Sequence, residues 1–304
     1  MLFVDVEEEF NWRAPFRREG YSTTATAALP EAHRRFTSLG MVPAYMTDYP
    51  VVDDPVSATM LRRLVETEGA VIGAQLHPWV NPPHDEALCE ENSFVGNLPI
   101  DLERAKLVAL TERIAEAVGE RPKIYRAGRY GIGPNSAKLL IEQGYRLDVS
   151  VRALFEYVQQ KGPDYSRHPH WPWWADPDHR LLALPMTSAY IGRLRKFGPI
   201  ARRFPALFQF LGGMRMLERV ALTPEGMPIA PTLMAIDALL EDGVELFSLS
   251  LHSPSLVPGH TPYVVDQDDL AWFWRWWDAV LNHFARAGVT AVDPRDLIAA
   301  ADAA

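Results

Sequence analysis

The sequence predicts an α/β fold in which parallel strands are covered by helices on the outside. Short apolar runs alternate with longer segments whose apolar residues recur at helical spacing, through most of the chain. Polar side chains stand where several of the apolar runs end. Strand–helix alternation of this kind is typical of a parallel sheet that is either open or closed into a barrel.

The expected strands are short, and most of the expected helices end at glycines. Strands are expected over residues 2–6, 42–46, 70–76, 123–126, 145–149, 180–186 and 246–251. Helices are expected over residues 29–39, 55–68, 101–118, 134–143 and 268–287, and residues 224–242 are expected to contain another. Residues 289–292 and a short terminal helix follow. Asp101 is the expected N-cap of its helix, and glycines at 40, 69, 119, 144 and 243 each directly follow an expected helix. No internal repeat or low-complexity linker interrupts the series, which favours a single domain over residues 1–304.

Two segments break the alternation and together form an aromatic and basic insertion at about residues 160–222. Residues 164–178 are dense in Trp, His and Pro, and residues 191–220 mix arginines and a lysine with apolar side chains. We expect the insertion to form a lid or a wall of a pocket. Its basic part, within 189–222, is expected to be a partly buried helical face, with contact to an anionic glycan or a membrane surface as the alternative.

Composition excludes several classes of protein. The net charge of -9 argues against nucleic-acid partners, because phosphate neutralisation needs a basic footprint. The single cysteine, Cys89, excludes internal disulfides and Cys-rich zinc sites. No apolar run is long enough for a membrane span, and the first residues lack the features of a signal peptide. A cytoplasmic location is therefore expected, with a missing upstream segment as the alternative, and the oligomeric state is left open.

Four polar stretches follow expected strands, and we expect them to meet in one site that hydrolyses an amide. They are residues 5–9, 76–81, 125–130 and 248–256. His252 comes where the last buried strand stops, and Pro254, Pro258 and Gly259 then force a loop. Because the carboxyl ends of the strands carry the active site in barrel enzymes, a histidine placed there can be aimed at a shared pocket.

The first stretch supplies carboxylates. While the chain stays extended, Asp5, Glu7 and Glu9 point to one side and Glu8 to the other. One carboxylate can act as a general base and another can hold a divalent metal, since carboxylates in different environments take different roles. A solvated acidic turn is the alternative.

The second stretch contains a candidate pair of metal ligands. His77 and Asn81 are one helical turn apart, so both can bind one metal, although an amide oxygen is a weaker zinc ligand than imidazole. Trp79 lies between them and can flank a sugar ring. The alternative is a loop histidine that caps backbone groups.

The remaining stretches supply a cation, an oxyanion donor and an acid. Arg126 can orient Asp5, and the backbone N–H of Tyr130 can stabilise an oxyanion. Asp148 lies inside an apolar strand and needs a partner, for which Arg126 is the candidate. His252 can protonate a leaving amine. The alternatives are a plain strand-to-helix turn and a structural histidine.

Taken in order, these stretches resemble the motifs of the polysaccharide deacetylases of carbohydrate esterase family 4, the NodB-homology proteins. The match is closest to the subgroup associated with lipopolysaccharide biosynthesis. Residues 3–8 stand where the family has T-F-D-D-G, and residues 77–81 stand where it has H-[ST]-x-x-H. Residues 125–130, 147–150 and 251–253 stand for its arginine, aspartate and closing histidine motifs. The resemblance spans nearly the whole chain.

The resemblance implies a distorted (β/α)7-type barrel and removal of an N-acetyl group from an amino sugar of a glycan, such as a cell-surface polysaccharide or a lipopolysaccharide precursor. Asp5 would be the catalytic base and His252 the catalytic acid, tuned by Arg126 and Asp148. A divalent metal, zinc or similar, would be held by Glu7, His77 and Asn81, with Glu8 as the next choice. The substrate would contact Trp79, Tyr130 and Asp48.

Two departures from the family pattern concern the metal. The second aspartate of the family is Val6 here, and the second metal histidine is Asn81. With one imidazole left, metal affinity is expected to fall, or the site recruits another group such as Asp48. A metal-independent hydrolase of a small or cyclic amide is therefore one alternative, and a barrel that binds sugar without catalysis is another.

Overall fold

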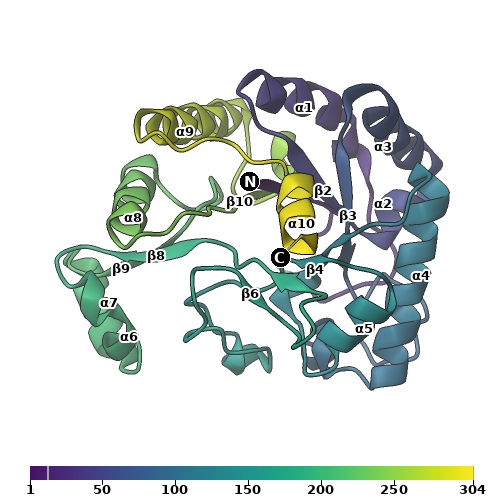
Figure 1. The fold of residues 1–304 in the computed structure, drawn as a ribbon, viewed down its shortest axis with the longest axis horizontal. Helices are drawn as coiled ribbons and strands as arrows, with labels where there is room; N and C mark the ends of the chain where they lie inside the picture. Colours follow the sequence, from purple (N-terminus) through teal and green to yellow (C-terminus); the bar gives the residue numbers. More distant parts are fainter. Residues whose placement is uncertain (12–13, 304) are drawn as a thin grey trace.

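A computed structural model describes residues 1–11 and 14–303 as a curled α/β structure built on one large sheet (Figure 1). The sheet has eight strands in the order β10-β1-β2-β3-β4-β5-β7-β6. Every neighbouring pair is parallel except β6 and β7. The strands are β1 (Leu2–Val6), β2 (Pro43–Thr47), β3 (Val71–Leu76), β4 (Ile124–Ala127), β5 (Leu147–Asp148), β6 (Trp173–Trp174), β7 (Leu182–Ala183) and β10 (Leu249–His252). The predicted fold class, a distorted barrel of mainly parallel strands with outer helices, is confirmed.

Helices surround the sheet on its outer side (Figure 1). They are α1 (Leu29–Ser38), α2 (Tyr49–Asp53), α3 (Pro55–Glu68), α4 (Ile100–Val118), α5 (Ser136–Glu142), α8 (Ile229–Glu241) and α9 (Gln267–Arg286), while α10 (Pro294–Asp302) packs at the end of the barrel interior. Short 3-10 turns join them at η1 (Thr24–Ala28), η2 (Glu91–Ser93), η3 (Val95–Asn97), η4 (Gly128–Tyr130), η5 (Val158–Gln160) and η7 (Ser253–Leu256). None of the helices in the described part of the chain is long and apolar enough to cross a membrane.

The insertion contains a two-stranded antiparallel sheet and a helical lobe. The sheet pairs β8 (Ser188–Ile191) with β9 (Glu218–Ala221), and between them lie η6 (Arg195–Phe197), α6 (Gly198–Ala201) and α7 (Pro205–Gly213). Thr187 at the start of the hairpin exchanges hydrogen bonds with Ser248, whose backbone N–H donates to the Thr187 hydroxyl over 2.8 Å. This contact joins the far side of the barrel to β10. The predicted insertion also includes β7, which belongs to the large sheet.

Side-chain alternation along β1 decides which residues reach the barrel interior. Leu2, Val4 and Val6 pack in the outer cluster with the helices, whereas Phe3 packs inside the barrel with Ile298 of α10. Full burial of one such aliphatic side chain contributes about 1.5–3 kcal/mol. A slip of one residue would turn the whole set over, so the register of β1 is strongly determined.

Two local expectations are corrected by the structure. α4 begins at Ile100 after Pro99, so Asp101 lies in the first turn and does not cap the helix. Only Leu182–Ala183 of the strand expected over 180–186 forms, since the N–H groups of residues 180 and 181 donate to the carboxylate of Asp176 instead of to a neighbouring strand. The helix expected within residues 224–242 is present as α8, which begins at Ile229 after Pro228.

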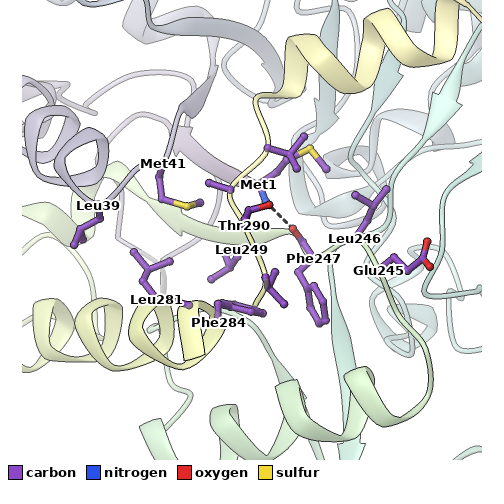
Figure 2. Close-up of a pocket in the computed structure, with 14 residues that line it drawn as sticks. Met1, Leu39, Met41, Glu245, Leu246, Phe247, Leu249, Leu281, Phe284 and Thr290 are labelled. Carbon is purple, nitrogen blue, oxygen red and sulfur yellow. Dashed lines mark hydrogen bonds between the residues drawn. The ribbon is translucent and has the colours of Figure 1, made fainter. Parts of the chain in front are cut away.

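One end of the barrel carries an apolar pocket (Figure 2). It lies beside Met1, whose amino group donates to the carbonyl of Phe247 over 2.8 Å, and its walls include Leu249, Leu281 and Phe284. The pocket is at the amino-terminal end of β1, opposite the end that carries the carboxylates. Its lining is mainly aliphatic and aromatic, and it brings together none of the predicted site residues.

Two glycines fix the long loop after β3 against the turn after β4. The N–H of Gly96 donates to the carbonyl of Gly131 over 2.7 Å. A Cβ atom at Gly133 would lie 2.3 Å from the carbonyl oxygen of Gly96, a distance that requires the backbone to move. The two backbone segments can therefore cross this closely only because glycine has no side chain.

We expect Gly133→Ala to lower the free energy of unfolding by about 1–3 kcal/mol, because the added methyl group overpacks a backbone contact. Urea denaturation measures the loss. Gly213→Ala is the matched control: nothing lies within 4 Å of its Cβ position, and its stability should be unchanged or raised by up to about 1 kcal/mol. Equal losses in the two variants would contradict the close approach.

Candidate active site

A polar pocket of about 220 Å³ lies at the carboxyl end of the strands, beyond Asp5. Its charged and imidazole groups lie on or directly after β1, β3, β4, β5 and β10 and in the loop after β9, and they are Asp5, Glu7, His77, Arg126, Arg129, Arg152, Glu225 and His252. Parallel strands present their carboxyl ends on one edge, so groups far apart in sequence meet there. Each of the four polar stretches predicted from the sequence therefore contributes at least one side chain to this pocket.

Asp5 is held between a cation and an imidazole. It faces the interior because it is two residues after Phe3 on β1. Its Oδ1 accepts a 2.7 Å hydrogen bond from Nη1 of Arg126, and its Oδ2 lies 3.6 Å from Nε2 of His252. Asp5 and His252 are register partners on neighbouring parallel strands, which explains why their side chains meet.

Arg126 has N–H groups that its contacts with the described residues do not use. Its side chain is almost completely buried, and its Nε and Nη2 have no hydrogen-bond partner among the described residues. A buried guanidinium with unused N–H groups costs free energy unless a further acceptor arrives. The pocket therefore favours a ligand that brings oxygen atoms to Arg126.

His252 forms a tight pair with Glu225. Its Nδ1 lies 2.6 Å from Oε2 of Glu225, and its backbone N–H donates to Oε1 of the same carboxylate over 3.0 Å. Ser255 donates a further hydrogen bond to that carboxylate, over 2.6 Å. Glu225 thereby fixes both the ring and the backbone of His252 at the end of β10.

The charges around His252 favour the imidazolium ion. Burial by itself would lower the pKa of His252, but Glu225, Glu7 and Asp5 outweigh that effect and raise the pKa to about 10. Burial by itself would raise the pKa of Glu225, but His252 and the hydrogen bond from Ser255 together outweigh that effect and hold the pKa of this carboxyl below its usual value. At neutral pH the pair is an ion pair whose Nε2–H points toward the pocket.

Glu7 lies at the wall of the pocket beside Gln75. Burial raises the pKa of Glu7 to about 8, with His252 and His77 opposing the rise and Glu8 and Asp5 adding to it. Gln75 donates to Oε2 of Glu7 over 3.2 Å, and the same oxygen lies 3.6 Å from Nε2 of His77. The other carboxyl oxygen of Glu7 has no hydrogen-bond partner among the described residues.

Glu8 points away from its neighbour Glu7 and into a different cluster, as side-chain alternation along an extended chain predicts. Its Oε2 lies 2.8 Å from Nδ1 of His77, and its Oε1 accepts from the indole N–H of Trp79 over 2.8 Å. The backbone N–H of Glu8 donates to Asp48 over 2.8 Å, and Asp48 also caps α2 through Val51. The indole of Trp79 stacks on His77 with 4.4 Å between ring centroids.

The cluster of Glu8, Asp48 and His77 is the group of described residues best suited to a metal. One ligand atom from each lies within 4.8 Å of the others. Burial raises the pKa of Glu8, and burial together with Glu8 raises the pKa of Asp48 well above its usual value. Two buried carboxylates that resist ionisation would both gain from a bound cation, so the donor set fits a divalent metal.

The structure does not add Asn81 to that cluster. Asn81 is buried, and its amide nitrogen donates to the carbonyls of Pro82 and Lys106 over 2.8 and 2.9 Å. The ammonium of Lys106 in turn donates to the carbonyls of residues 78, 81 and 83. Asn81 does not line the pocket, and its contacts hold the loop after His77 in place.

Asp148 has a different partner from the one expected. On β5, Leu147 and Val149 pack inside the barrel, so Asp148 between them points to the opposite side. Its Oδ1 accepts from the N–H and hydroxyl of Ser150 over 2.9 and 2.5 Å, whereas Arg126 donates to Asp5. Burial raises the pKa of Asp148 to about 6, while Ser150 and Arg126 oppose the rise. The expected direct pair with Arg126 is therefore corrected to a longer-range electrostatic contact.

Aromatic and basic side chains form the outer wall of the pocket. Trp79 and Tyr130 line it, and Tyr130 adopts a left-handed backbone conformation with φ of 62° at the turn after β4. Arg152, Tyr157 and Tyr263 complete this wall, and the Arg152 guanidinium lies over the ring of Tyr130 at 5.3 Å.

Sequence reasoning missed Glu225, Gln75 and Arg152. Glu225 falls in the segment expected only to contain a helix, and no spacing relates it to His252. Gln75 could have been found, because it stands two residues before His77 on β3 and alternation places both on one face. Arg152 follows the short strand β5 without any motif around it.

Comparisons with known proteins bear on the fold. No family model matches the sequence, and no curated protein is similar to it in sequence. A solved structure from Mycobacterium smegmatis, assigned as a polysaccharide deacetylase, is similar with a TM-score of 0.50 and 16% identity over 92% of this chain and 77% of that chain. PuuE allantoinase has a TM-score of 0.51 and 15% identity, over 99% and 88% of the two chains. A 4-α-glucanotransferase from Thermococcus litoralis has a TM-score of 0.51 and 12% identity, over 99% of this chain and 40% of that chain. At these identities the likeness is one of fold, and the barrel is the feature that all four chains share.

We expect Glu225→Gln to lower the pKa of His252 by at least about one unit, because the variant removes the carboxylate that most favours the imidazolium. The folded pKa of about 10 lies above the value of about 6.5 for an unperturbed histidine, so the stabilisation is complete below pH ~6.5 and is lost as the pH rises through about 10. Nuclear magnetic resonance of labelled histidine follows the titration. Asp237→Asn, which removes the partner of the distant His283, should leave the His252 titration unchanged. A wild-type His252 that titrates near pH 6.5 would contradict this electrostatic description.

Proposed function

We propose that the protein is a hydrolase of carbon–nitrogen amide bonds that removes an N-acetyl group from an amino sugar of a glycan. The observation that carries the proposal is the pairing of Asp5 with His252 at one pocket, each held by its own buried counter-charge, Arg126 or Glu225. A cell-surface polysaccharide or a lipopolysaccharide precursor is the proposed source of the amino sugar.

The proposed reaction uses Asp5 as base and His252 as acid. Asp5 takes a proton from a water molecule, whose oxygen attacks the carbonyl carbon of the amide. Arg126 holds Asp5 in place, and its unused N–H groups are available to the oxygen on which negative charge develops. His252 then gives its Nε2 proton to the nitrogen as the carbon–nitrogen bond breaks, which releases acetate and the amine.

The protonation state of His252 supports its role as the acid. A pKa raised to about 10 keeps the imidazolium present at neutral pH, so the proton is in place before the reaction starts. Glu225 fixes the ring by binding Nδ1, which leaves Nε2 directed at the pocket. A carboxylate here holds an imidazolium, and the imidazolium faces the place where the reaction would occur. Histidine often acts as a general acid in this way.

The lining of the pocket supports a sugar substrate. Trp79, Tyr130, Tyr157 and Tyr263 present aromatic surface, and Arg152 adds a cation beside them. Aromatic rings with a few polar groups are typical of small-molecule sites that fix a ligand's orientation. Two of the similar folds come from proteins whose descriptions name a polysaccharide or glucan, and the barrel is thus compatible with carbohydrate substrates.

A divalent metal would be held by Glu8, Asp48 and His77. When bound, such an ion supplies positive charge that polarises a nearby oxygen ligand. Trp79 donates to Glu8 and thereby orients one of the ligands, and the N-cap contact of Asp48 orients another. Glu7, the ligand first expected from the sequence, faces the other nitrogen of His77 and supports its orientation from the pocket side.

A metal-independent amide hydrolase is the second candidate, and one observation favours it. Glu8 and Asp48 do not line the pocket that Asp5 and His252 line, so the cluster and the acid–base pair occupy different sides of His77. The similar fold of an allantoinase gives a precedent for a small amide-containing substrate on this barrel.

We expect Asp5→Asn and His252→Ala each to lower kcat/KM for acetate release from N-acetylated oligosaccharides by at least about 10³-fold, since each removes a proton-transfer group. A coupled acetate assay measures the rate. His283→Ala changes a half-buried histidine on α9 that does not line the pocket, and as the matched control it should stay within about twofold of the wild type. Near wild-type rates in both variants would contradict the assignment of Asp5 as base and His252 as acid.

We expect protein purified without chelators to carry up to one divalent ion per chain, and Glu8→Gln and Asp48→Asn each to weaken its binding about 10- to 100-fold, because each removes a ligand charge. Elemental analysis and metal titration give the values. Glu9→Gln is the control, since Glu9 contacts Ser22, Thr24 and His260 instead. Full activity at negligible metal content would select the metal-independent candidate.

A further inference from the structure

The helical lobe of the insertion exposes a concentration of large apolar side chains. The lobe is residues 193–216, which hold η6, α6 and α7 between β8 and β9, and it extends away from the barrel at the lower left of Figure 1. Its exposed members are Phe197, Ile200, Phe204, Leu207, Phe210 and Met214. Phe210 is 64% exposed and Phe204 is 59% exposed, although burial of a phenylalanine is strongly favourable.

The lobe has a buried face as well, so the exposed side chains are not the result of an unpacked helix. Phe208 and Leu211 of α7 pack against a small core that contains Tyr190 and Leu217. The backbone of the lobe is closed at its base by a 3.0 Å hydrogen bond from the N–H of Leu194 to the carbonyl of Met216. The lobe therefore presents its second apolar face outward from a fixed base.

The same lobe is basic in an acidic protein. Residues 193–217 contain five arginines and one lysine and no acidic residue, while the whole chain has a net charge of -9. Arg195 pairs with Asp242, and Arg202 pairs with Glu156. The other cations are exposed and make no ion pair with a described residue, and they are Arg193, Lys196, Arg203 and Arg215.

We propose that this lobe attaches the protein to the surface of an anionic lipid bilayer. The apolar side chains of α6 and α7 enter the boundary between headgroups and acyl chains, and the unpaired cations contact anionic headgroups. A bilayer matches both the apolar side chains and the cations of the lobe, because its apolar interior lies beneath a layer of negatively charged headgroups.

Charge decides against a second copy of the chain as the occupant. In a two-fold dimer the same patch faces itself, which would bring the four unpaired cations of each copy toward one another. Like charges placed together across an interface oppose association. A lipid surface provides the opposite charge.

The position of the lobe connects it to the pocket. Arg202 at the base of the lobe pairs with Glu156, and Arg219 on β9 lies over the ring of Phe155 at 3.8 Å. Arg152, which lines the pocket, lies over the same ring at 3.9 Å. The lobe that would bind the bilayer is thus in contact with the segment that forms the outer wall of the pocket. The inference does not depend on the reaction proposed for that pocket.

Vesicle co-sedimentation of the full chain tests the inference. Wild-type protein should bind vesicles of phosphatidylcholine mixed with phosphatidylglycerol, bind pure phosphatidylcholine at least about tenfold more weakly, and be released by high salt. The variant Phe197→Ser/Phe204→Ser/Phe210→Ser should lose binding at least about tenfold, because the inserted apolar area is removed. Its control is Val56→Ser/Val158→Ser/Trp171→Ser, which removes three other exposed apolar side chains and should bind as the wild type does.

A charge variant tests the cations separately. Lys196→Glu/Arg203→Glu/Arg215→Glu should weaken binding at least about tenfold, whereas Arg34→Glu/Arg63→Glu/Arg275→Glu, with the same charge change on α1, α3 and α9, should weaken it less than about twofold. Circular dichroism melting identifies variants that fail to fold, and for those the single changes Phe210→Ser and Arg203→Glu replace the triple ones. Absence of wild-type binding, equal binding to neutral vesicles, or self-association that the phenylalanine variant abolishes would each overturn the inference.

Discussion

Side-chain alternation on strands that are buried on both faces is the constraint on which the site depends. On β1 it sends Val4 and Val6 to the helices and Asp5 to the interior, and on β10 it sends Leu251 outward and His252 inward. The apolar members fix the register, because their burial is lost if the strand slips by one residue. Asp5 and His252 meet because hydrophobic packing elsewhere on their strands leaves them no other orientation.

Charge balance is the second condition that the pocket has to satisfy. Its buried acids, Asp5, Glu7 and Glu225, lie close to two buried cationic groups, Arg126 and the imidazolium of His252. Glu7 meets the imbalance by holding a proton, since its pKa is raised to about 8, while Asp5 pairs with Arg126 and Glu225 with His252. A buried pair is costly to break from either side, so each member fixes the protonation state of its neighbour.

The parallel strands and the residues at their ends could be predicted, because both follow from short-range patterns. Asp5, His77, Arg126 and His252 stand directly after or near the ends of apolar runs, and the structure brings them to one pocket. The orientation of Asp148 could not be predicted, since a strand that is apolar on both sides does not reveal which face is inner. Glu225 could not be found either, because its pairing with His252 depends on a loop between β9 and α8 whose course no local pattern describes.

The position after Asp5 cannot supply a ligand to the pocket. Val6 is completely buried among the outer helices, so a ligand at this position could not reach the pocket while β1 keeps its register. The nearest carboxylates are then Glu7, which faces the pocket, and Glu8, which joins Asp48 and His77. A bound cation would compensate the carboxylates of Glu8 and Asp48, which lie outside the pocket. Inside the pocket, Asp5 is already paired with Arg126, and Glu225 with His252. The proposed acid–base pair is therefore electrostatically complete without a metal, and a bound metal would act on the orientation of His77.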